Sequence, residues 1–466
     1  MSNGRSTSPI DLGTLLDTGA WSRYQKWVLA FSAVAFAVDG LANQVLGVAI
    51  PALVEAWGVP KTDFASVAAL GLAGVALGTA GGGLLGDKIG RRWGLIASMT
   101  LFGLATVGTA LVSNVHSLMI LRFFDGLGIG GAIPSGAALI SEFTPHRRRS
   151  RAIAIGMVFI PVGGFLAGSL GSLILPGLGW RAYFLTAGVL PLVAAVLFLF
   201  VLPESPRFLR REAARKPELL ALLARFGHRL DADSQIVDRA DDEQTDRAPL
   251  TALLGPKVIR DTLGIWGAFF FCLMASYTMF SWVPTMLAGL QFDAVIASIA
   301  ISAFNFGGMI GGVSCGFLIE RVGSRKSLTA LTLGSIAVAV ALQFVVSLDS
   351  PPALLVISTM VIEGICISGI HNVVYTLAAH AYPPFIRATG VGAASTVGRF
   401  GAILSSYTGV LALEIGGANA YFASIAVLLG MCLLVGLVVR NHVPPADAEP
   451  ADQREQPAGS AAKQAT

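Results

Sequence analysis

One carboxylate lies within the first long apolar stretch of the sequence, residues 36–51 (FAVDGLANQVLGVAIP). This residue, Asp39, is followed by the amides of Asn43 and Gln44, and the stretch contains no Lys, Arg or His. A charge near the centre of a membrane helix costs at least about 2.5–3.5 kcal/mol, so such a residue usually faces a partner or a wet cavity. Asp39 and Asn43 share one helical face. We therefore expect Asp39 to bind a transported proton and Asn43 to contact substrate.

An arginine, Arg122, lies in a later apolar stretch, three residues before Asp125. A guanidinium favours the charged form of a nearby carboxyl, whereas burial favours the neutral form. An Asp39–Arg122 contact that forms and breaks could therefore load and release one proton. The alternative is a static ion pair that locks two helices together. Asp125 and Glu363 are further candidates for proton coupling.

A second intramembrane arginine, Arg399, offers a planar and permanently charged fork for a carboxylate. We expect it to capture an anionic substrate; the alternative is an ion pair with an acid of the protein such as Glu363. His371 and Tyr375 are four residues apart and point the same way, so they could hydrogen-bond a phenol or carboxylate, although a structural histidine is equally compatible. The predicted substrate-binding residues are Asn43, Asn305, His371, Asn372, Tyr375 and Arg399.

Several aromatic residues in the apolar stretches could stack on a ring-bearing ligand. Each of them alone is more often a residue that faces lipid or a neighbouring helix. They are Phe36, Tyr277, Trp282, Phe304, Phe400 and Tyr407.

The composition explains why these residues are expected in a membrane. The 466 residues are 54% hydrophobic and 13% charged, with a mean hydropathy of +0.71, whereas soluble proteins average about 25% charged residues. Apolar runs long enough to span a bilayer recur in two sets of six. The sequence thus predicts an all-α membrane protein with twelve transmembrane helices in two pseudo-symmetric six-helix bundles. The runs are 25–51, 64–86, 92–113, 117–141, 151–175, 181–202, 262–287, 294–319, 328–348, 352–379, 389–413 and 420–440.

The polar segments set the predicted domain bounds. Residues 1–24 are an N-terminal segment, 25–202 the first bundle, 203–261 a linker with a short helix near 217–226, 262–440 the second bundle, and 441–466 a disordered tail. Basic residues gather in the loops of one side, which predicts that both termini and the linker are cytoplasmic. Only Lys61 and Arg181 lie on the other side.

An internal repeat relates the two sets of runs. Gly83 and Asp87 recur as Gly316 and Glu320, both offset by 233 (316 − 83), and Asp125-Gly126 recurs as Glu363-Gly364, offset by 238 (363 − 125). Repeated halves of this kind place a binding site between two units that rock against each other.

These motifs resemble the major facilitator superfamily. The loop GxxxDxxGRR at 83–92 is the family's most specific mark; RxxxGxGxG at 122–130 and PESPRFL at 203–209 support it. The chain looks most like the aromatic acid:proton symporters, on the evidence of Asp39-Gly40, the sequence GLGIGGAIPSGAALISEF at 126–143, and Gly398-Arg399-Phe400-Gly401. That family has a second acid in its first helix, where this chain has Ala42. The resemblance implies related roles for Asp39 and Arg122, and the departure implies a lower proton stoichiometry.

Charged residues at the cytoplasmic ends of the runs are expected to form an ion-pair latch that stabilises the outward-open state, tighter in the first half than in the second. Setting of topology is the alternative role for such charges. The expected latch residues are Asp87, Arg91, Arg92, Glu142, Arg149, Glu320, Arg325 and Arg387.

The sequence therefore predicts a multi-pass inner-membrane transporter that imports a small aromatic carboxylate, such as a hydroxybenzoate-like acid, by proton symport. The alternatives are transport of another small organic anion or sugar, proton-driven efflux, and a membrane sensor. No enzymatic activity, metal, cofactor or nucleic-acid partner is expected, and the chain is expected to act as a monomer in the lipid bilayer. The four cysteines have no metal-ligand spacing.

Overall fold

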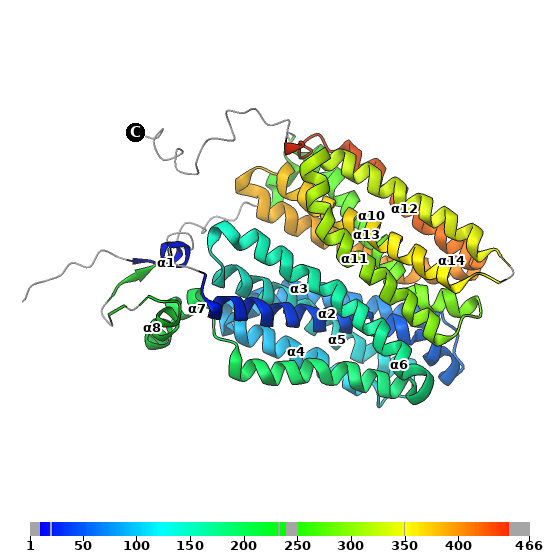
Figure 1. The fold of residues 1–466 in the computed structure, drawn as a ribbon, viewed down its shortest axis with the longest axis horizontal. Coiled ribbons are helices and arrows are strands. Elements are labelled where there is room, and N and C mark those ends of the chain that lie inside the picture. Colours follow the sequence, from blue (N-terminus) through cyan, green and yellow to red (C-terminus); the bar gives the residue numbers. More distant parts are fainter. Residues whose placement is uncertain are drawn as a thin grey trace, which may run out of the picture.

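Ten long helices make up most of the structure, a computed structural model that describes residues 10–18, 21–228, 230–231, 234–238, 250–256, 258–348 and 350–446. Helices in the first half of the sequence are α2 (Arg23–Trp57), α3 (Asp63–Ile89), α4 (Arg91–Thr109), α5 (Val115–Phe143) and α6 (His146–Val201). Those in the second half are α10 (Ile259–Gly289), α11 (Ala294–Val322), α12 (Ser324–Val346), α13 (Ala353–Ala381) and α14 (Pro384–Val438). Figure 1 shows α2–α6 gathered on one side and α10–α14 on the other; we call these groups the first and second halves.

Nine helices in the described ranges are long and apolar enough to cross a membrane. The two longest, α6 and α14, each cover two of the predicted runs and are broken between them. Gly179 in α6 has φ 74°, in the left-handed region that favours glycine, and Gly416 and Gly417 depart from helical angles in α14. The tenth long helix, α4, begins with two arginines. The count of twelve spans remains a prediction.

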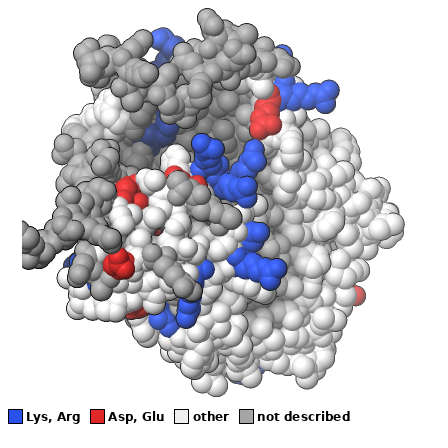
Figure 2. Space-filling view, turned by 60° about the vertical axis from the view of Figure 1, so that its left-hand side comes forward, with Lys and Arg blue, Asp and Glu red and all other residues white. Residues whose placement is uncertain are grey.

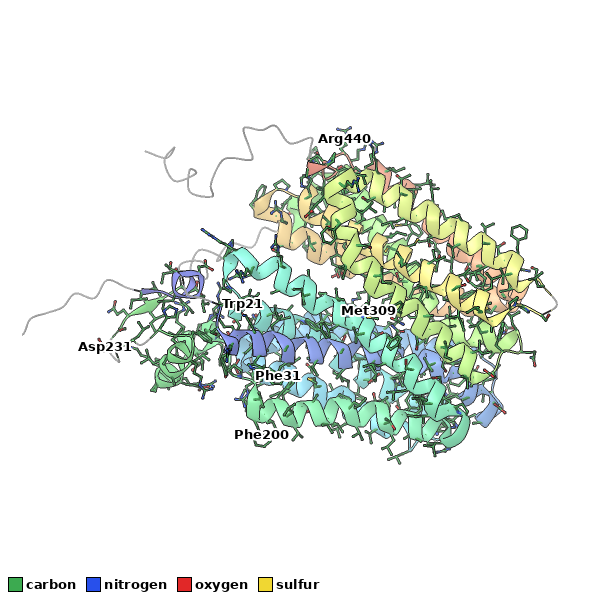
Figure 3. All side chains as sticks on the ribbon, in the orientation of Figure 1. Trp21, Phe31, Phe200, Asp231, Met309 and Arg440 are labelled. Carbon is green, nitrogen blue, oxygen red and sulfur yellow. The ribbon has the colours of Figure 1, made fainter. Side chains whose placement is uncertain are left out.

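The outer surface of the helices is rich in apolar side chains. Phe200 of α6 is 84% exposed and Leu173 of the same helix is 77% exposed; Figure 3 shows Phe200 on the outside of the first half. A water-soluble monomer rarely exposes apolar surface on this scale, so this surface is suited to lipid contact.

The repeat seen in the sequence is also a repeat of helix packing. A Cβ at Gly126 of α5 would strike the carbonyl oxygen of Gly71 in α3, and a Cβ at Gly364 of α13 would strike that of Phe304 in α11. The offsets are 238 (364 − 126) and 233 (304 − 71), the same pair of values that relates the sequence motifs. The α3–α5 and α11–α13 crossings therefore share one register, in which glycine allows the backbones to approach closely.

Short elements form a cap at one end of the first half. They are β1 (Ile10–Asp11), α1 (Leu12–Thr18), α7 (Pro206–Arg211), η1 (Ala213–Arg215), α8 (Lys216–Arg225) and β2 (Ile236–Val237), with η2 (Leu250–Leu254) further along the linker. Strand β1 pairs in parallel with β2, Ile10 opposite Ile236. Leu16 and Leu222 share a core with Phe143 at the end of α5.

The cap joins the N-terminal segment to the linker, a contact that the sequence did not reveal. The short helix predicted at 217–226 is confirmed as α8. Of the predicted disordered tail, residues 447–466 lie outside the described residues, whereas Val443 near its start is hydrogen-bonded to Ser324 of α12. We call the end that carries the cap the cap end, and the opposite end the distal end.

Candidate substrate and proton site

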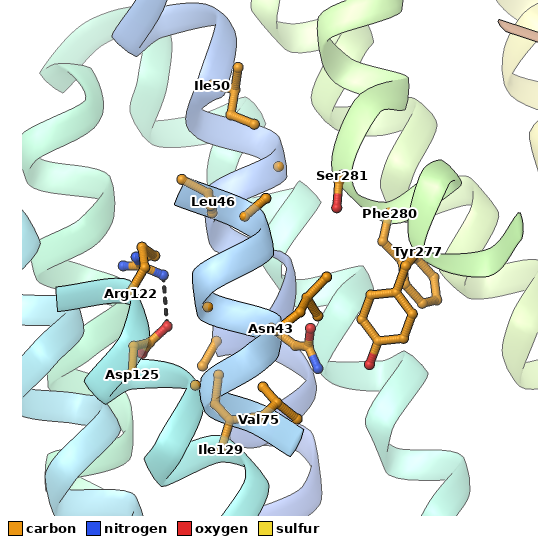
Figure 4. A pocket seen from close by; sticks show the side chains of 16 residues that line it. Asn43, Leu46, Ile50, Val75, Arg122, Asp125, Ile129, Tyr277, Phe280 and Ser281 are labelled. Carbon is orange, nitrogen blue, oxygen red and sulfur yellow. Dashed lines mark hydrogen bonds and ion pairs between the residues drawn. The ribbon is translucent and has the colours of Figure 1, made fainter. Parts of the chain in front are cut away.

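A small cavity of about 50 Å³ lies between the two halves. Figure 4 shows its lining: Asn43 comes from α2, Arg122 and Asp125 from α5, and Tyr277 and Phe280 from α10. The first half thus contributes three polar or charged residues among mainly apolar ones, and the second half contributes two aromatic residues and Ser281. Both halves of the molecule contribute to the cavity, as expected for a site between rocking units.

Asp39 and Arg122 do not form the expected contact. The carboxylate partner of Arg122 is Asp125 of the same helix. The Nη1 of Arg122 donates to Oδ2 of Asp125 at 2.8 Å, and its Nη2 donates to Oγ1 of Thr109 at 3.0 Å. Asp125 also accepts a hydrogen bond from Thr106 at 2.7 Å. Arg122 and Asp125 are each 3% exposed. The prediction missed this pair because it considered contacts between helices, whereas residues three apart on one helix already face each other.

Asp39 is fully buried in α2, with 0% of its surface exposed. Neither carboxyl oxygen has a hydrogen-bond partner among the described residues. The charged groups that act on it electrostatically are Arg399 of the second half and Asp125 of the first. The cation that acts electrostatically on Asp39 is therefore Arg399, whereas the sequence predicted Arg122.

Arg399 of α14 lies beside an aromatic hydroxyl. Its Nη1 donates to Oη of Tyr277 at 3.4 Å. The predicted alternative, an ion pair with Glu363, is absent from the part of the chain that the structure describes. Glu363 instead accepts a hydrogen bond from Ser335 of α12 at 2.6 Å and is 1% exposed. The guanidinium of Arg399 is therefore not neutralised by that acid.

His371 and Tyr375 of α13 lie together, as their spacing predicted. Their rings stack with centroids 5.0 Å apart and planes at 9°. The hydroxyl of Tyr375 lies 3.3 Å from Oγ of Ser395 in α14, and the charge of Arg399 acts on His371. Asn372, the neighbour of His371, donates to the carbonyl oxygen of Gly312 in α11 at 3.2 Å.

Asn305 of α11 occupies a contact between the halves. Its Nδ2 donates to Oε1 of Gln44 in α2 at 2.7 Å, and Nε2 of Gln44 donates back to its Oδ1 at 2.9 Å. Both residues are buried, with 2% and 4% exposed. Gln44 was noted in the sequence but not assigned a role. Its place in an apolar run was the available signal, since a buried amide requires a partner.

A second polar contact between the halves lies next to this pair. Ser302 of α11 donates to the carbonyl oxygen of Phe165 in α6 at 3.0 Å and lies 3.3 Å from the hydroxyl of Ser169. Further towards the distal end, Lys61 forms an ion pair with Glu414 at 3.2 Å. These contacts hold the halves together from the amide pair to the distal end. Figure 2, in which the cap end is turned forward, shows Lys and Arg side chains gathered near the middle of this face.

Two of the expected ion pairs of the first-half latch are present, and both lie in a cluster within that half; a role in stabilising the outward-open state stays a prediction. Arg91 contacts Asp87 at 2.5 Å and Glu142 at 3.6 Å. Glu142 also accepts a hydrogen bond from Ser205 in the PESPRFL segment. The charge of Glu142, together with those of Asp17 and Asp238, acts on Arg149.

Glu204 is a member of this cluster that sequence reasoning missed. Its Oε1 accepts hydrogen bonds from the backbone N–H groups of Arg92 at 3.1 Å and Ser205 at 2.9 Å, while the Nη2 of Arg92 donates to the carbonyl oxygen of Leu199. Burial raises the pKa of Glu204, and these backbone donors oppose that effect. Glu204 thus connects the start of the linker to the first turn of α4 through its hydrogen bond from Arg92.

The second half has a different arrangement at the cap end. Arg387 donates to the carbonyl oxygen of Tyr382 at 3.4 Å. No ion pair of Glu320 or Arg325 is present within the described ranges. Ser324, which stands where the first half has Arg91, binds the segment after α14: its hydroxyl lies 3.1 Å from Nδ1 of His442 and accepts from the backbone N–H of Val443 at 2.9 Å.

Several known proteins resemble this chain in sequence or in fold. The sequence profile described as Major Facilitator Superfamily matches residues 32–406. The "Gallate transporter" of Pseudomonas putida is 31% identical over 90% of this chain and 95% of its own length. The "4-hydroxybenzoate transporter PcaK" of Pseudomonas aeruginosa is 30% identical over 94% and 97%. A crystal structure of a D-xylose-proton symporter has a TM-score of 0.69 at 17% identity, covering 91% of this chain and 99% of that one. The chain belongs to the major facilitator superfamily, and it is a membrane transporter rather than an enzyme.

Proposed function

We propose that this protein imports a small aromatic carboxylate together with a proton. The observation that carries the proposal is the placement of Arg399 and Asp39. Arg399 carries a permanent positive charge that Glu363 does not neutralise, and Asp39 is a buried carboxyl without a hydrogen-bond partner among the described residues. Arg399 is suited to bind an anionic substrate, and Asp39 is suited to bind a proton.

The aromatic class of substrate rests on the site and on the relatives. Tyr277 and Phe280 line the cavity between the halves, and the rings of His371 and Tyr375 stack close to Arg399. Relatives that span nearly the whole chain are named for gallate and 4-hydroxybenzoate. A ring with a carboxylate at one end and a hydroxyl at the other would use the guanidinium, the aromatic faces and the polar groups of Asn43, His371 and Tyr375.

The coupling mechanism follows from the cost of a buried charge. An isolated carboxylate away from water is costly, whereas its neutral acid is far less so. We propose that Asp39 carries the proton while it is buried as in this conformation, and releases it when water or a changed distance to Arg399 favours the charged form. Asp125 would hold Arg122 in place instead of exchanging protons with Asp39. Glu363 remains a second proton candidate.

We propose that the chain crosses the inner membrane twelve times, as two six-helix bundles with both termini cytoplasmic. The breaks at Gly179 and at Gly416–Gly417 support two spans in each of α6 and α14. Alternating access would then exchange this form, closed at the distal end, for one in which the contacts between Gln44 and Asn305 are broken.

The stoichiometry has a measurable consequence. With one proton and a monovalent anion the cycle moves no net charge, so only the pH gradient would drive import. An extra proton would add about 2.3 kcal/mol per 100 mV of membrane potential. Ala42, where the aromatic acid symporters carry a second acid, favours the neutral cycle.

The test is uptake of labelled 4-hydroxybenzoate into proteoliposomes with an imposed pH gradient, acid outside. We expect accumulation that a protonophore abolishes and that an added potassium diffusion potential leaves unchanged. Accumulation indifferent to the protonophore, or export against the gradient, would contradict symport. Uptake of aliphatic acids or xylose in place of aromatic acids would contradict the substrate class.

A further inference from the structure

A phenol hydroxyl lies beside the guanidinium proposed to bind substrate. The Nη1 of Arg399 on α14 donates to Oη of Tyr277 on α10 at 3.4 Å. Arginine has only donors, so the oxygen of Tyr277 must be the acceptor and its own O–H remains able to donate. No other hydrogen bond uses this hydroxyl in the part of the chain that the structure describes.

The ring of Tyr277 is held by other aromatic rings. It meets Phe280 of the same helix edge-to-face, with centroids 5.6 Å apart and planes at 80°, and Phe280 meets Phe304 of α11 at 5.6 Å and 79°. Such edge-to-face contacts fix the orientation of a ring in addition to burying it. These ring contacts therefore hold the hydroxyl of Tyr277 in a fixed position, as a binding site requires.

The hydroxyl of Tyr277 also faces the opposite half of the molecule. In Figure 4, Tyr277 and Asn43 extend towards each other from α10 and α2, and both line the cavity. The cavity lining thus has the phenol of Tyr277 in the second half and the amide of Asn43 in the first, while Arg399 lies outside the lining and is joined to it by its hydrogen bond to Tyr277.

We propose that Tyr277 and Arg399 form one carboxylate receptor and that Tyr277 determines the preference for acids over their neutral analogues. The hydroxyl of Tyr277 accepts from Arg399, which positions the guanidinium, and donates its O–H to a carboxylate oxygen of the substrate. Hydrogen bonds to an ionised acceptor are roughly twice as strong as those between neutral groups. A carboxamide of the same shape lacks the charge that both groups recognise. This inference rests on the proposed transport of an organic anion.

The test compares Tyr277→Phe with the wild type, because this change removes the hydroxyl and keeps the ring. Uptake of labelled 4-hydroxybenzoate is measured with unlabelled 4-hydroxybenzoate or 4-hydroxybenzamide as competitor. We expect KM for the acid to rise about tenfold, equivalent to about 1.4 kcal/mol, with the maximal rate nearly unchanged. The preference for acid over amide should fall by the same factor. The matched control is Tyr24→Phe, since Tyr24 lies at the cap end, away from the cavity, and its hydroxyl likewise accepts a hydrogen bond from an arginine, Arg225, at 3.2 Å; it should behave as wild type.

Three results would overturn the proposal. They are an unchanged KM, an unchanged preference for acid over amide, and a fall in the maximal rate alone, which would indicate a purely structural role for Tyr277.

A binding assay separates this inference from the proposed function. Thermal stabilisation of the detergent-solubilised protein is measured with benzoate, 4-hydroxybenzoate and succinate. If only succinate stabilises the wild type and Tyr277→Phe loses that effect, the carboxylate receptor stands while the aromatic substrate class is wrong. If none of these acids stabilises the wild type, the receptor itself is contradicted.

Discussion

The side-chain amides of Gln44 and Asn305 exchange two hydrogen bonds across the boundary between the halves, at 2.9 and 2.7 Å. An amide pair of this kind satisfies each partner with one donor and one acceptor. Ser302 and the Lys61–Glu414 ion pair lie on the distal side of this pair and also join the halves. Opening the distal end must therefore break it.

Removal of either amide is expected to favour the form that is open at the distal end. Each of the two hydrogen bonds is worth about 1 kcal/mol net, so Gln44→Ala, which removes both, should raise distal accessibility roughly thirtyfold. The measurement is the rate at which a membrane-impermeant maleimide labels Ser281→Cys, in the cavity lining, when the native cysteines are replaced.

The control for this experiment exchanges the two amides. Gln44→Asn combined with Asn305→Gln keeps the same groups at the boundary, and labelling should return towards the wild-type rate. An equal labelling rate in Gln44→Ala and the wild type would show that the pair does not hold the distal end closed.

Asp39→Asn is expected to separate exchange from accumulation. The amide has nearly the shape of the acid but cannot release a proton, so substrate exchange across the membrane should continue while pH-driven accumulation falls to equilibrium. Counterflow and gradient-driven uptake in the same proteoliposomes measure the two activities. Accumulation equal to that of the wild type would move the proton site to Glu363 or His371.

The Arg122–Asp125 pair is expected to stabilise the fold more than it serves coupling. Removal of one partner of a buried ion pair costs about 3–5 kcal/mol, since it leaves an uncompensated charge, whereas replacement of both is far less harmful. Arg122→Leu should thus unfold at a lower temperature than the double variant Arg122→Leu/Asp125→Leu. Thermal unfolding in detergent measures this difference. Equal unfolding temperatures for the single and double variants would argue against a structural pair.

Glu204 is expected to make stability depend on pH. Because burial raises its pKa in the folded state, the folded protein binds the proton more tightly than the unfolded chain, and stability is lost as the pH rises through the folded pKa. Glu204→Gln retains an oxygen that can accept from the N–H groups of Arg92 and Ser205. The variant should gain stability relative to wild type between pH 5 and pH 8.

Unfolding temperatures of both proteins across this range check that prediction. If the wild type instead became more stable relative to the variant as the pH rises, the charged form of Glu204 would be the stabilising one, which would contradict the prediction.

Much of the helical framework could be predicted from the sequence, because apolar length and glycine spacing are local properties. The offset of Asp125 to Glu363 marked the repeat, and the same offset governs the packing of Gly126 and Gly364. The Arg122–Asp125 pair was also predictable in principle from its spacing on one helix.

The contacts between distant segments could not be predicted in this way. Gln44 and Asn305 are 261 residues apart, and no local pattern states which amide meets which. The pairing of β1 with β2 involves two residues from each strand, too few for a recognisable strand pattern. The proximity of Arg399 to Tyr277 depends on how α10 packs against α14, which a single sequence does not specify.

The central claim is that a proton enters together with the substrate. The most direct measurement follows the pH of a lightly buffered suspension of proteoliposomes when 4-hydroxybenzoate is added without any imposed gradient. The account predicts that the external medium becomes more alkaline at the rate of substrate uptake, and that Asp39→Asn abolishes this signal. Substrate uptake without alkalinisation, or with acidification, would contradict it.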